Sequence, residues 1–479
     1  MKCAMRMRWV KFEFFLSCEN LLGVPAGWGV ASRELSVRFG GAPPLRAAIR
    51  PEPCGDEAGN SFAHPDVVRV SSALRRSLML PEGLVCRALL SAGGEEIPEL
   101  RIGPVIGLLL GVHTNRYTPE HMRKYSDRLG VYGQVGGLVC AFSPKSVDWE
   151  RRTAWGLYYD FCAGEWKYAG FPLPDVIYRR DFHCDPRTVG RLSQCVGGRL
   201  FNSWRFDKMQ LYDYLSGDAR LGAFLPQTER CENFPHLCRF LERFPRAILK
   251  PVDLSRGRGI CVIESGSGKN DGEPAGTYRI TDYRPRRPSV SLFSDKAALA
   301  AFFDANPDLF RGYLVQRYLD LARIGPSPFD IRVVMQKRPG SVWACSGIEC
   351  RESAGGSHLT NISRGGSALT LEEALRASFG AAQEECEAMR EKVIAFCEEF
   401  CRKMDRFGGH FAEFGVDIAL DTARGIWLIE ANVFPSFKGF RRTDPRTYRR
   451  IRYTPLLYAL SLTAFGRRGS QDVVLRPEE

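Results

Sequence analysis

The sequence of 479 residues predicts an α+β protein built from more than one domain. Three observations support this prediction. Short strand-like runs separated by Gly, Pro and Ser fill residues 1–100, the nearly continuous apolar run GPVIGLLLG begins at Gly103, and helical and strand-like patterns alternate from Phe201 to about Gly466. Because one hydrophobic core rarely grows beyond about 250–300 residues, we expect two or three domains.

Changes in the sequence pattern predict four segments. Residues 1–100 are expected to form a β-rich accessory barrel or sandwich. Residues 101–198 show strand, helix and strand patterns in this order, which predicts a small α/β domain with a parallel sheet. Residues 199–466 are expected to form a larger α+β domain, and residues 467–479 a polar tail.

The spacing of apolar residues predicts individual elements inside these segments. The Gly-, Ser-, Pro- and Arg-rich stretch 265–290 is expected to form an exposed loop or a mobile hairpin. The expected strands are 103–111, 136–144, 173–180, 246–252, 259–264, 330–337 and 342–350. The expected helices are 119–130, 206–215, 295–306 and 371–405, the last of them broken near Gly380.

The composition indicates a globular protein with a basic surface. Hydrophobic residues make up 44% and charged residues 25% of the chain, which is ordinary for globular domains. The formal net charge is +12, and much of the excess is arginine, as in RRTDPRTYRRIR at 441–452. Such a surface attracts nucleic acid, anionic polymers or phosphate-bearing substrates. No nucleic-acid-binding signature accompanies the charge, so we expect no specific nucleic-acid partner.

The cysteines and the N-terminus point to a cytoplasmic protein. The sixteen cysteines form no C-x-x-C pair, and several lie in apolar runs, such as Cys140, Cys261 and Cys345. This pattern is typical of buried, reduced thiols. The apolar stretch near the N-terminus is interrupted by Lys11 and Glu13, which makes it a poor signal peptide. No run of about 18 apolar residues occurs, so no membrane span is expected.

The stretch Phe414–Asn432, FGVDIALDTARGIWLIEAN, predicts a β-hairpin. Two apolar runs, Val416–Leu420 and Ile426–Ile429, flank the turn-forming residues DTARG at 421–425.

This hairpin brings polar side chains together. If the first turn residue pairs with the first residue of the second strand, Leu420 faces Trp427 and Asp417 lies opposite Glu430. Asn432 projects from the same face. Opposed carboxylates repel unless a cation lies between them, and oxygen ligands suit Mg²⁺. The alternative is a solvated hairpin with an acidic outer face.

A second set of candidates is cationic. Lys250 ends an expected strand and is followed by a glycine-containing loop with Ser255, Gly257 and Gly259. Successive backbone N–H groups in such a loop can surround phosphate oxygens, and the lysine can neutralise them. The pattern of a Walker A loop is absent. The alternative is an ordinary turn beside a solvated lysine.

Three weaker signals complete the set. Asp330 and Arg332 share one strand face, where the arginine could hold a γ-phosphate or a carboxylate, or form a local ion pair. Asn361 and Arg364 belong to a second glycine-containing loop, which could close over phosphate or be a simple turn. Lys208 lies on an expected helix, where a lysine is by itself most often solvated.

The order of these signals along the chain resembles the ATP-grasp superfamily. The resemblance covers about residues 200–465, and its most specific parts are ILKPVDLSRGRGI, FDIRVVMQ and WLIEANVFPS. Within the superfamily the chain is similar to the YheC/YheD type, described as endospore-coat-associated, with GPVIGLLLG and RLFNSWRFDKMQLYDYL as support. The resemblance implies an α+β ATP-grasp fold, in which two subdomains clamp ATP, preceded by a small α/β domain and a β-rich N-terminal region.

The resemblance also implies roles for individual residues. The phosphates of ATP would contact Lys208 and Lys250, with the loop of Ser255, Gly257 and Gly259 closing over them. Asn361 would belong to the nucleotide site, and Arg332 and Arg364 would be catalytic cations for the phosphate or the acyl phosphate. The remaining assignments are an adenine-reading strand of Gln316, Arg317, Tyr318 and Leu319, a ribose contact from Asp320, and Mg²⁺ ligands Asp417, Glu430 and Asn432.

The implied reaction is ATP-dependent ligation. ATP phosphorylates a substrate carboxylate, and an amine or a thiol then attacks the acyl phosphate, with Mg²⁺ and cationic residues stabilising the transferred phosphoryl group. The carboxylate and the amine are unidentified, and a peptide or a coat protein is a candidate for either. The alternative is a coat or scaffold protein that binds nucleotide without turnover, or binds none. By this resemblance a cytoplasmic protein would become associated with the endospore coat.

Overall fold

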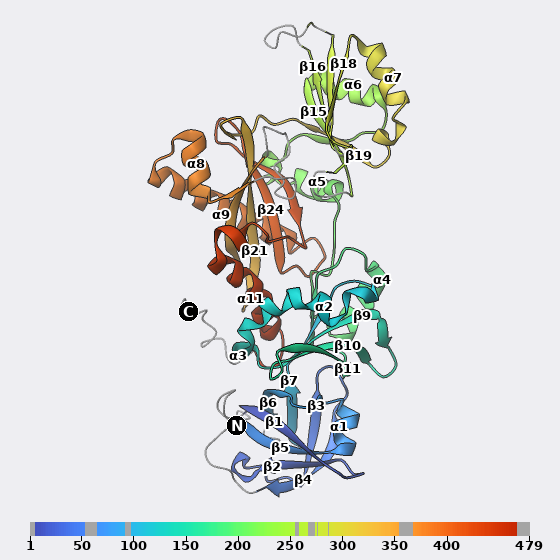
Figure 1. The fold of residues 1–479 in the computed structure, drawn as a ribbon, viewed down its shortest axis with the longest axis vertical. Helices are drawn as coiled ribbons and strands as arrows, with labels where there is room; N and C mark the ends of the chain where they lie inside the picture. Colours follow the sequence, from blue (N-terminus) through green and yellow to red (C-terminus); the bar gives the residue numbers. More distant parts are fainter. Residues whose placement is uncertain are drawn as a thin grey trace.

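Four β-sheets follow one another along an elongated molecule, from the N-terminal barrel at one end to a β-sheet at the other (Figure 1). We call them the first to fourth sheet in the order in which the chain forms them. The computed structural model describes residues 5–52, 65–91, 97–253, 258–266, 274, 276–285, 287–353 and 367–466.

The first sheet is a closed barrel of strands in the order β1-β5-β2-β4-β3-β7-β6. Alternate residues face its interior: in β3, Leu35, Val37 and Phe39 are fully buried. Closure leaves no free strand edge. Its elements are β1 Met5–Phe15, β2 Leu21–Pro25, η1 Ala26–Trp28, β3 Glu34–Phe39, β4 Leu45–Glu52, β5 Asp66–Ser71, α1 Ser72–Leu78, β6 Val85–Ser91 and β7 Glu99–Gly103.

The second sheet has the order β11-β10-β9-β8-β12-β13. Strand β8 is parallel to β9 and β12, as an α/β domain requires, whereas β10 and β11 form an antiparallel extension. The strands are β8 Val105–Leu109, β9 Leu138–Asp148, β10 Thr153–Asp160, β11 Glu165–Pro172, β12 Val176–Arg179 and β13 Leu200–Phe201. The helices are η2 Thr114–Arg116, α2 Pro119–Met122, η3 Arg123–Val131, α3 Tyr132–Val135 and α4 Pro186–Cys195.

The helix expected over 119–130 is present, but only its first turn, α2, is α-helical, and η3 is a 3₁₀-helix. Met122, Arg128, Leu129 and Val131 are buried. The buried face therefore includes the arginine, which the apolar pattern does not reveal.

The third sheet is antiparallel, with the order β14-β19-β15-β16-β17-β18. Helices α6 and α7 contribute to one core with it, through residues such as Phe240 and Phe303. Strand β17 lies inside 265–290 and pairs antiparallel with β16 and β18, which agrees with the hairpin alternative for this stretch. The elements are β14 Thr228–Arg230, α6 Phe234–Arg243, β15 Arg246–Pro251, β16 Cys261–Ser265, β17 Tyr278–Asp282, β18 Ser289–Phe293, α7 Lys296–Asp304, η5 Pro307–Phe310 and β19 Tyr313–Arg317.

The fourth sheet has the order β23-β22-β21-β24-β25, with β20 paired to β21. In β21, Ile331, Val333 and Met335 are fully buried in the core that contains α8 and α9. Gly380 ends α8 at φ 62°, which confirms the predicted break. The strands are β20 Arg323–Ile324, β21 Ser327–Arg338, β22 Val342–Glu352, β23 Ser367–Leu369, β24 Glu413–Leu420 and β25 Ile426–Asn432. The helices are α5 Lys208–Ser216, η4 Gly222–Phe224, α8 Leu371–Phe379, α9 Gln383–Met404, α10 Phe440–Thr443 and α11 Pro445–Ser461.

Helix α11 connects the fourth sheet to the second sheet (Figure 1). Its residues Leu456, Leu457 and Tyr458 are buried in the core of the α/β domain, while Ile451 packs against Val334 of β21. These two sheets are therefore held together by one continuous helix.

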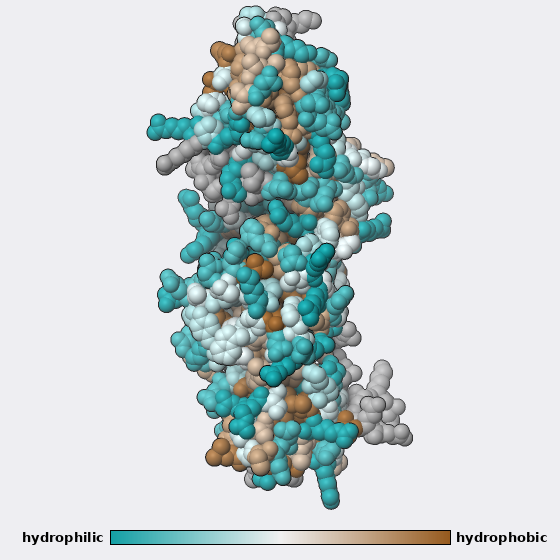
Figure 2. All heavy atoms as spheres, turned by 90° about the vertical axis from the view of Figure 1, so that its right-hand side faces the viewer, coloured by the Kyte–Doolittle hydropathy of each residue, from teal (hydrophilic) through white to brown (hydrophobic). Residues whose placement is uncertain are grey.

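The surface is largely hydrophilic on the face that Figure 2 displays, with apolar atoms gathered over its uppermost part. The described cysteines are free thiols, and most are buried, as predicted. Within the described ranges no helix combines the length and apolar character that crossing a membrane requires.

Candidate functional site

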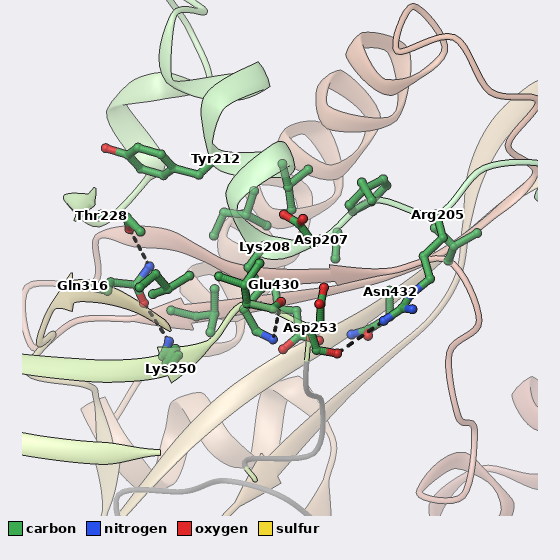
Figure 3. Close-up of a pocket in the computed structure, with 18 of the residues that line it drawn as sticks. Arg205, Asp207, Lys208, Tyr212, Thr228, Lys250, Asp253, Gln316, Glu430 and Asn432 are labelled. Carbon is green, nitrogen blue, oxygen red and sulfur yellow. Dashed lines mark hydrogen bonds between the residues drawn. The ribbon is translucent and has the colours of Figure 1, made fainter. Parts of the chain in front are cut away.

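A pocket of about 890 Å³ opens between the third and fourth sheets, beside the first turn of α5 (Figure 3). Its walls come from α5, β15, β19 and β25, so segments far apart in the sequence meet there. Its polar lining is Arg205, Asp207, Lys208, Tyr212, Thr228, Lys250, Asp253, Gln316, Glu430 and Asn432.

Lys250 projects into this pocket from β15. Its Nζ donates to Oε1 of Gln316 at 2.6 Å, and Nε2 of Gln316 donates to Oγ1 of Thr228 at 2.8 Å. Burial and the neighbouring Lys208 lower the pKa of Lys250 to about 8, although Glu430 acts against them. An anionic ligand would relieve both effects, so the site fits phosphate.

Lys208 enters the same pocket from the start of α5, which a capping box between Asp207 and Gln210 stabilises. Its Nζ donates to the carbonyl oxygens of Pro251 at 3.2 Å and Val252 at 3.5 Å. Burial lowers the pKa of Lys208 as well. The structure thus brings together the helix lysine and the strand lysine that the sequence singled out.

The β24–β25 hairpin pairs Asp417 with Glu430, as predicted. Near the turn the prediction was wrong by one residue, because Leu420 pairs with Ile426 and not with Trp427. A bulge in β25 restores the predicted pairing farther along. The bulge thus compensates for the error at the turn.

Asp421 organises the turn of this hairpin. Its Oδ1 accepts the backbone N–H groups of Ala423 at 3.0 Å and Gly425 at 2.7 Å, and its Oδ2 accepts Nε1–H of Trp427 at 2.8 Å. Asp421 therefore belongs to the turn and not to the strand pair.

Asp417 is buried and engaged by two arginines. Arg332 donates to it through Nε and Nη2, and Nη2 of Arg351 lies 3.1 Å from its Oδ2. Although burial opposes ionisation, these two guanidinium groups hold the pKa of Asp417 below its ordinary value. Nε and Nη2 of Arg351 donate to Oδ1 and Oδ2 of Asp330 at 2.6 and 2.7 Å. The ion pairs therefore join residues of neighbouring strands, and Asp330 does not pair with Arg332 of its own strand.

Glu349 is a buried carboxyl that sequence reasoning missed. It lies on β22 directly opposite Arg332 and is 3% exposed, and its Oε2 has no hydrogen-bond partner among the residues that the structure describes. Burial raises the pKa of Glu349 to about 7, although Arg332 and Arg351 lower it. Two arginines and two aspartates already balance on this face, so a third carboxyl is retained in its neutral form at moderate pH.

The fit to Mg²⁺ differs among the three predicted ligands. Glu430 and Asn432 line the pocket, whereas Asp417 does not and is engaged by arginines. Mg²⁺ beside a triphosphate is commonly held by one or two protein groups plus phosphate oxygens, so Glu430 and Asn432 fit this ion. The described residues contain no group of three or more His, Cys, Asp or Glu side chains suited to a metal.

The predicted adenine-reading strand is only partly in place. Gln316 lines the pocket. The backbone N–H groups of Arg317 and Tyr318 donate to the carbonyl oxygens of Gln227 at 2.8 Å and Arg246 at 3.0 Å, so the protein already uses both donors.

Other predicted residues lie outside the pocket lining or outside the described ranges. Leu319 is buried elsewhere, and Asp320 pairs with Arg246. Gly259 has φ 77°, and a Cβ there would lie 2.5 Å from the Pro251 ring, so this position requires glycine. Outside the described residues are Ser255, Gly257, Asn361 and Arg364.

Sequence reasoning also missed part of the pocket wall. Thr228 holds Gln316, and Asp253 lies three residues after Lys250 within the motif already singled out. Phe182 comes from the α/β domain, and its ring contacts Phe434 with centroids 5.1 Å apart. The spacing from Lys250 could have indicated Asp253, but no local signal marks Phe182.

Comparison with known proteins identifies the family of this chain. The sequence pattern of the YheC/D-like ATP-grasp family matches residues 197–462, more than half of the chain. The endospore coat-associated proteins YheD and YheC of Bacillus subtilis are 26% identical over 384 residues and 23% identical over 351 residues. The alignments cover 75% of this chain and 81% of YheD, and 70% of this chain and 92% of YheC.

Among solved structures, N5-carboxyaminoimidazole synthetase from Staphylococcus aureus complexed with ADP is similar, with a TM-score of 0.41 and 9% identity. The similarity covers 75% of this chain and 77% of the synthetase. The family match itself confirms the predicted superfamily and fold class. The chain belongs to the YheC/D-like ATP-grasp family.

Proposed function

We propose that this protein is an ATP- and Mg²⁺-dependent ligase that joins a carboxylate to an amine or a thiol through an acyl phosphate. The observation that carries the proposal is the pocket in which Lys208 and Lys250 lie near Glu430 and Asn432 (Figure 3). Two amines beside two hard oxygen donors suit a triphosphate with a cation on its oxygens. This arrangement requires no protein nucleophile.

Each residue has a distinct task in this proposal. Lys208 and Lys250 bind phosphate oxygens, and the hydrogen bond to Gln316 aims the amine of Lys250. Glu430 and Asn432 would hold Mg²⁺, which when bound neutralises charge on the transferred phosphoryl group. The apolar lining, which includes Leu314, limits access of water to the phosphates.

The two proposed catalytic arginines act differently. Arg332 pairs with Asp417, so its task as the structure stands is to position that carboxylate beside Glu430. Arg364 is the candidate cation for the acyl phosphate.

The substrates are proposed to include a peptide or a coat protein as the carboxylate or amine component. Support comes from the relatives, which are named endospore coat-associated. We propose that the protein is made in the cytoplasm and becomes associated with the coat.

A second candidate function is nucleotide binding without turnover, as in a coat scaffold. The engagement of Asp417 by Arg332 and Arg351 favours it, because only two of the three expected metal ligands are free to face the pocket. Product formation separates the two candidates, since nucleotide binding is common to both.

The test uses the full chain with Mg²⁺-ATP and a panel of carboxylates and amines, followed by mass spectrometry. A ligase yields ADP, inorganic phosphate released from the acyl phosphate, and a product whose mass equals both substrates less water. Mg²⁺-ATP should raise the unfolding midpoint, because a ligand of the folded state stabilises it. Lys250→Ala should weaken this shift, whereas Lys296→Ala, at an exposed lysine of α7, should not. An unchanged wild-type midpoint would refute the nucleotide site.

A further inference from the structure

Exposed cations are concentrated on the segment that follows β25. We call the five exposed side chains Lys438, Arg441, Arg442, Arg446 and Arg449 the basic ridge. Between its first and last residue the sequence holds a single carboxylate, Asp444, whose Oδ1 already accepts the backbone N–H of Thr447 at 2.9 Å.

The basic ridge differs from other exposed or half-buried arginines of the molecule. Arg220, Arg390 and Arg424 each lie within 3.2 Å of a glutamate oxygen. Among the ion pairs between described residues, none involves a side chain of the ridge. Arg446 and Arg449 are three residues apart on α11, a spacing at which like charges destabilise a helix. Within the described part of the chain, no ion pair therefore balances the positive charge of the ridge.

The positive surface continues onto η3, which packs against α11. Arg123 and Lys124 are exposed there, and the nearby Asp127 is already bonded to Arg452 and to the hydroxyl of Tyr448. Burial and Arg116 lower the pKa of Lys124, as expected where cations outnumber anions.

The ridge is fixed in position relative to the pocket. It begins six residues after Asn432, and the connecting segment is held by Arg180, whose Nη2 donates to the carbonyl oxygen of Pro435 at 2.7 Å. The same guanidinium lies 5.2 Å from the ring centre of Phe437. The chain therefore leads within six residues from the end of β25 into the ridge, whose helices α10 and α11 pack against β21, β22 and β23.

We propose that the basic ridge binds an acidic polypeptide segment, which delivers the carboxylate substrate to the pocket. The second half of this statement rests on the proposed function. Exposed cations distributed over two helices match a series of separate carboxylates, whereas a single phosphate would need converging donors. Single-stranded nucleic acid would need aromatic faces for stacking, and the ridge offers only Tyr448, which is half-buried and bonded to Asp127.

The test measures fluorescence anisotropy of a labelled oligoglutamate peptide with the full chain, at low and at physiological ionic strength. The ridge variant combines Arg442→Ser, Arg446→Ser and Arg449→Ser. The control variant removes the same charge from exposed arginines elsewhere and combines Arg187→Ser, Arg230→Ser and Arg239→Ser. The ridge variant should lose at least about tenfold in affinity and the control less than about twofold, because close charges contribute more than distant ones.

Three results would overturn the proposal: no binding of the peptide by the wild type, equal losses in both variants, or tighter ridge-dependent binding of a single-stranded oligonucleotide of equal charge. The Mg²⁺-ATP shift of the unfolding midpoint, measured on the same proteins, separates the two proposals. Peptide binding without any nucleotide shift would refute the proposed function and leave the ridge as a docking surface. A nucleotide shift without peptide binding would refute only the ridge.

Discussion

At the scale of single residues, the pocket holds charged groups in unfavourable surroundings. Lys250 has its pKa lowered to about 8 by burial and by Lys208, and Glu430 lies opposite Asp417, which two arginines already engage. Unfavourable electrostatic surroundings of this kind are retained at sites where a bound ligand relieves them. The residues that contribute most to nucleotide affinity should therefore contribute least to the free energy of unfolding of the ligand-free protein.

Affinity for Mg²⁺-ATP should fall as the pH rises through about 8, because Lys250 then loses its proton in the free protein. Lys250→Arg should remove this fall, and Lys250→Met should weaken binding at every pH. Calorimetric titration on both sides of pH 8 measures the effect. The same decline in Lys250→Arg as in the wild type would contradict this assignment.

Stability without ligand should depend on pH in the opposite sense. The folded pKa of Lys250 lies below the ordinary 10.5, so the folded state binds fewer protons between these values and gains stability as the pH rises across them.

The two opposed carboxylates of the hairpin should respond differently to neutralisation. Asp417→Asn leaves the buried Arg332 and Arg351 with one fewer anion, which should cost about 3–5 kcal/mol of unfolding free energy. Glu430→Gln removes the repulsion from Asp417 and also the attraction to Lys208 and Lys250, so the free protein should change in stability by less than about 1 kcal/mol. Chemical denaturation gives both values.

The nucleotide response completes this comparison. Glu430→Gln should reduce the Mg²⁺-ATP shift of the unfolding midpoint, because it removes an anionic ligand from the pocket. Retention of the full shift would show that this carboxylate is not part of the metal site.

At the scale of elements, the hairpin depends on its turn. Asp421→Ala removes the acceptor of two backbone N–H groups and of the Trp427 indole, which should cost about 1–3 kcal/mol. Thr422→Ala is the matched control, since Thr422 is exposed in the same turn. A loss in the control as large as in Asp421→Ala would show that the turn tolerates no change at all and that the carboxylate has no special part.

The same hairpin shows what sequence reasoning could predict. The pairing of Asp417 with Glu430 followed from the position of the turn, and the strand lysine Lys250 from the glycine-containing loop after it, while the resemblance gave Lys208 its role. The bulge in β25 could not be predicted, because no residue type marks it. Arg351 and Glu349 were missed for a different reason: their neighbours are set by the register of β21 with β22, and a slip by one residue would reverse every face.

At the scale of the whole molecule, charge governs encounters with other polymers. The net charge of +12 should give weak association with nucleic acids that depends on salt and not on sequence. Filter binding with unrelated sequences at several salt concentrations measures this association. Nanomolar affinity for one sequence that persists at physiological salt would contradict the expectation.

The chain passes between the third and fourth sheets next to Gln227 and again next to Arg317, and a hydrogen bond of 2.8 Å joins these two crossings. Two neighbouring connections of this kind allow the third sheet to rotate about one axis relative to the fourth sheet and oppose translation between the two sheets. Arg180 joins the fourth sheet to the α/β domain through Glu413 and Pro435. We therefore expect the third sheet to turn about these two crossings, with the hydrogen bonds from Lys208 to the carbonyl oxygens of Pro251 and Val252 opposing the turn.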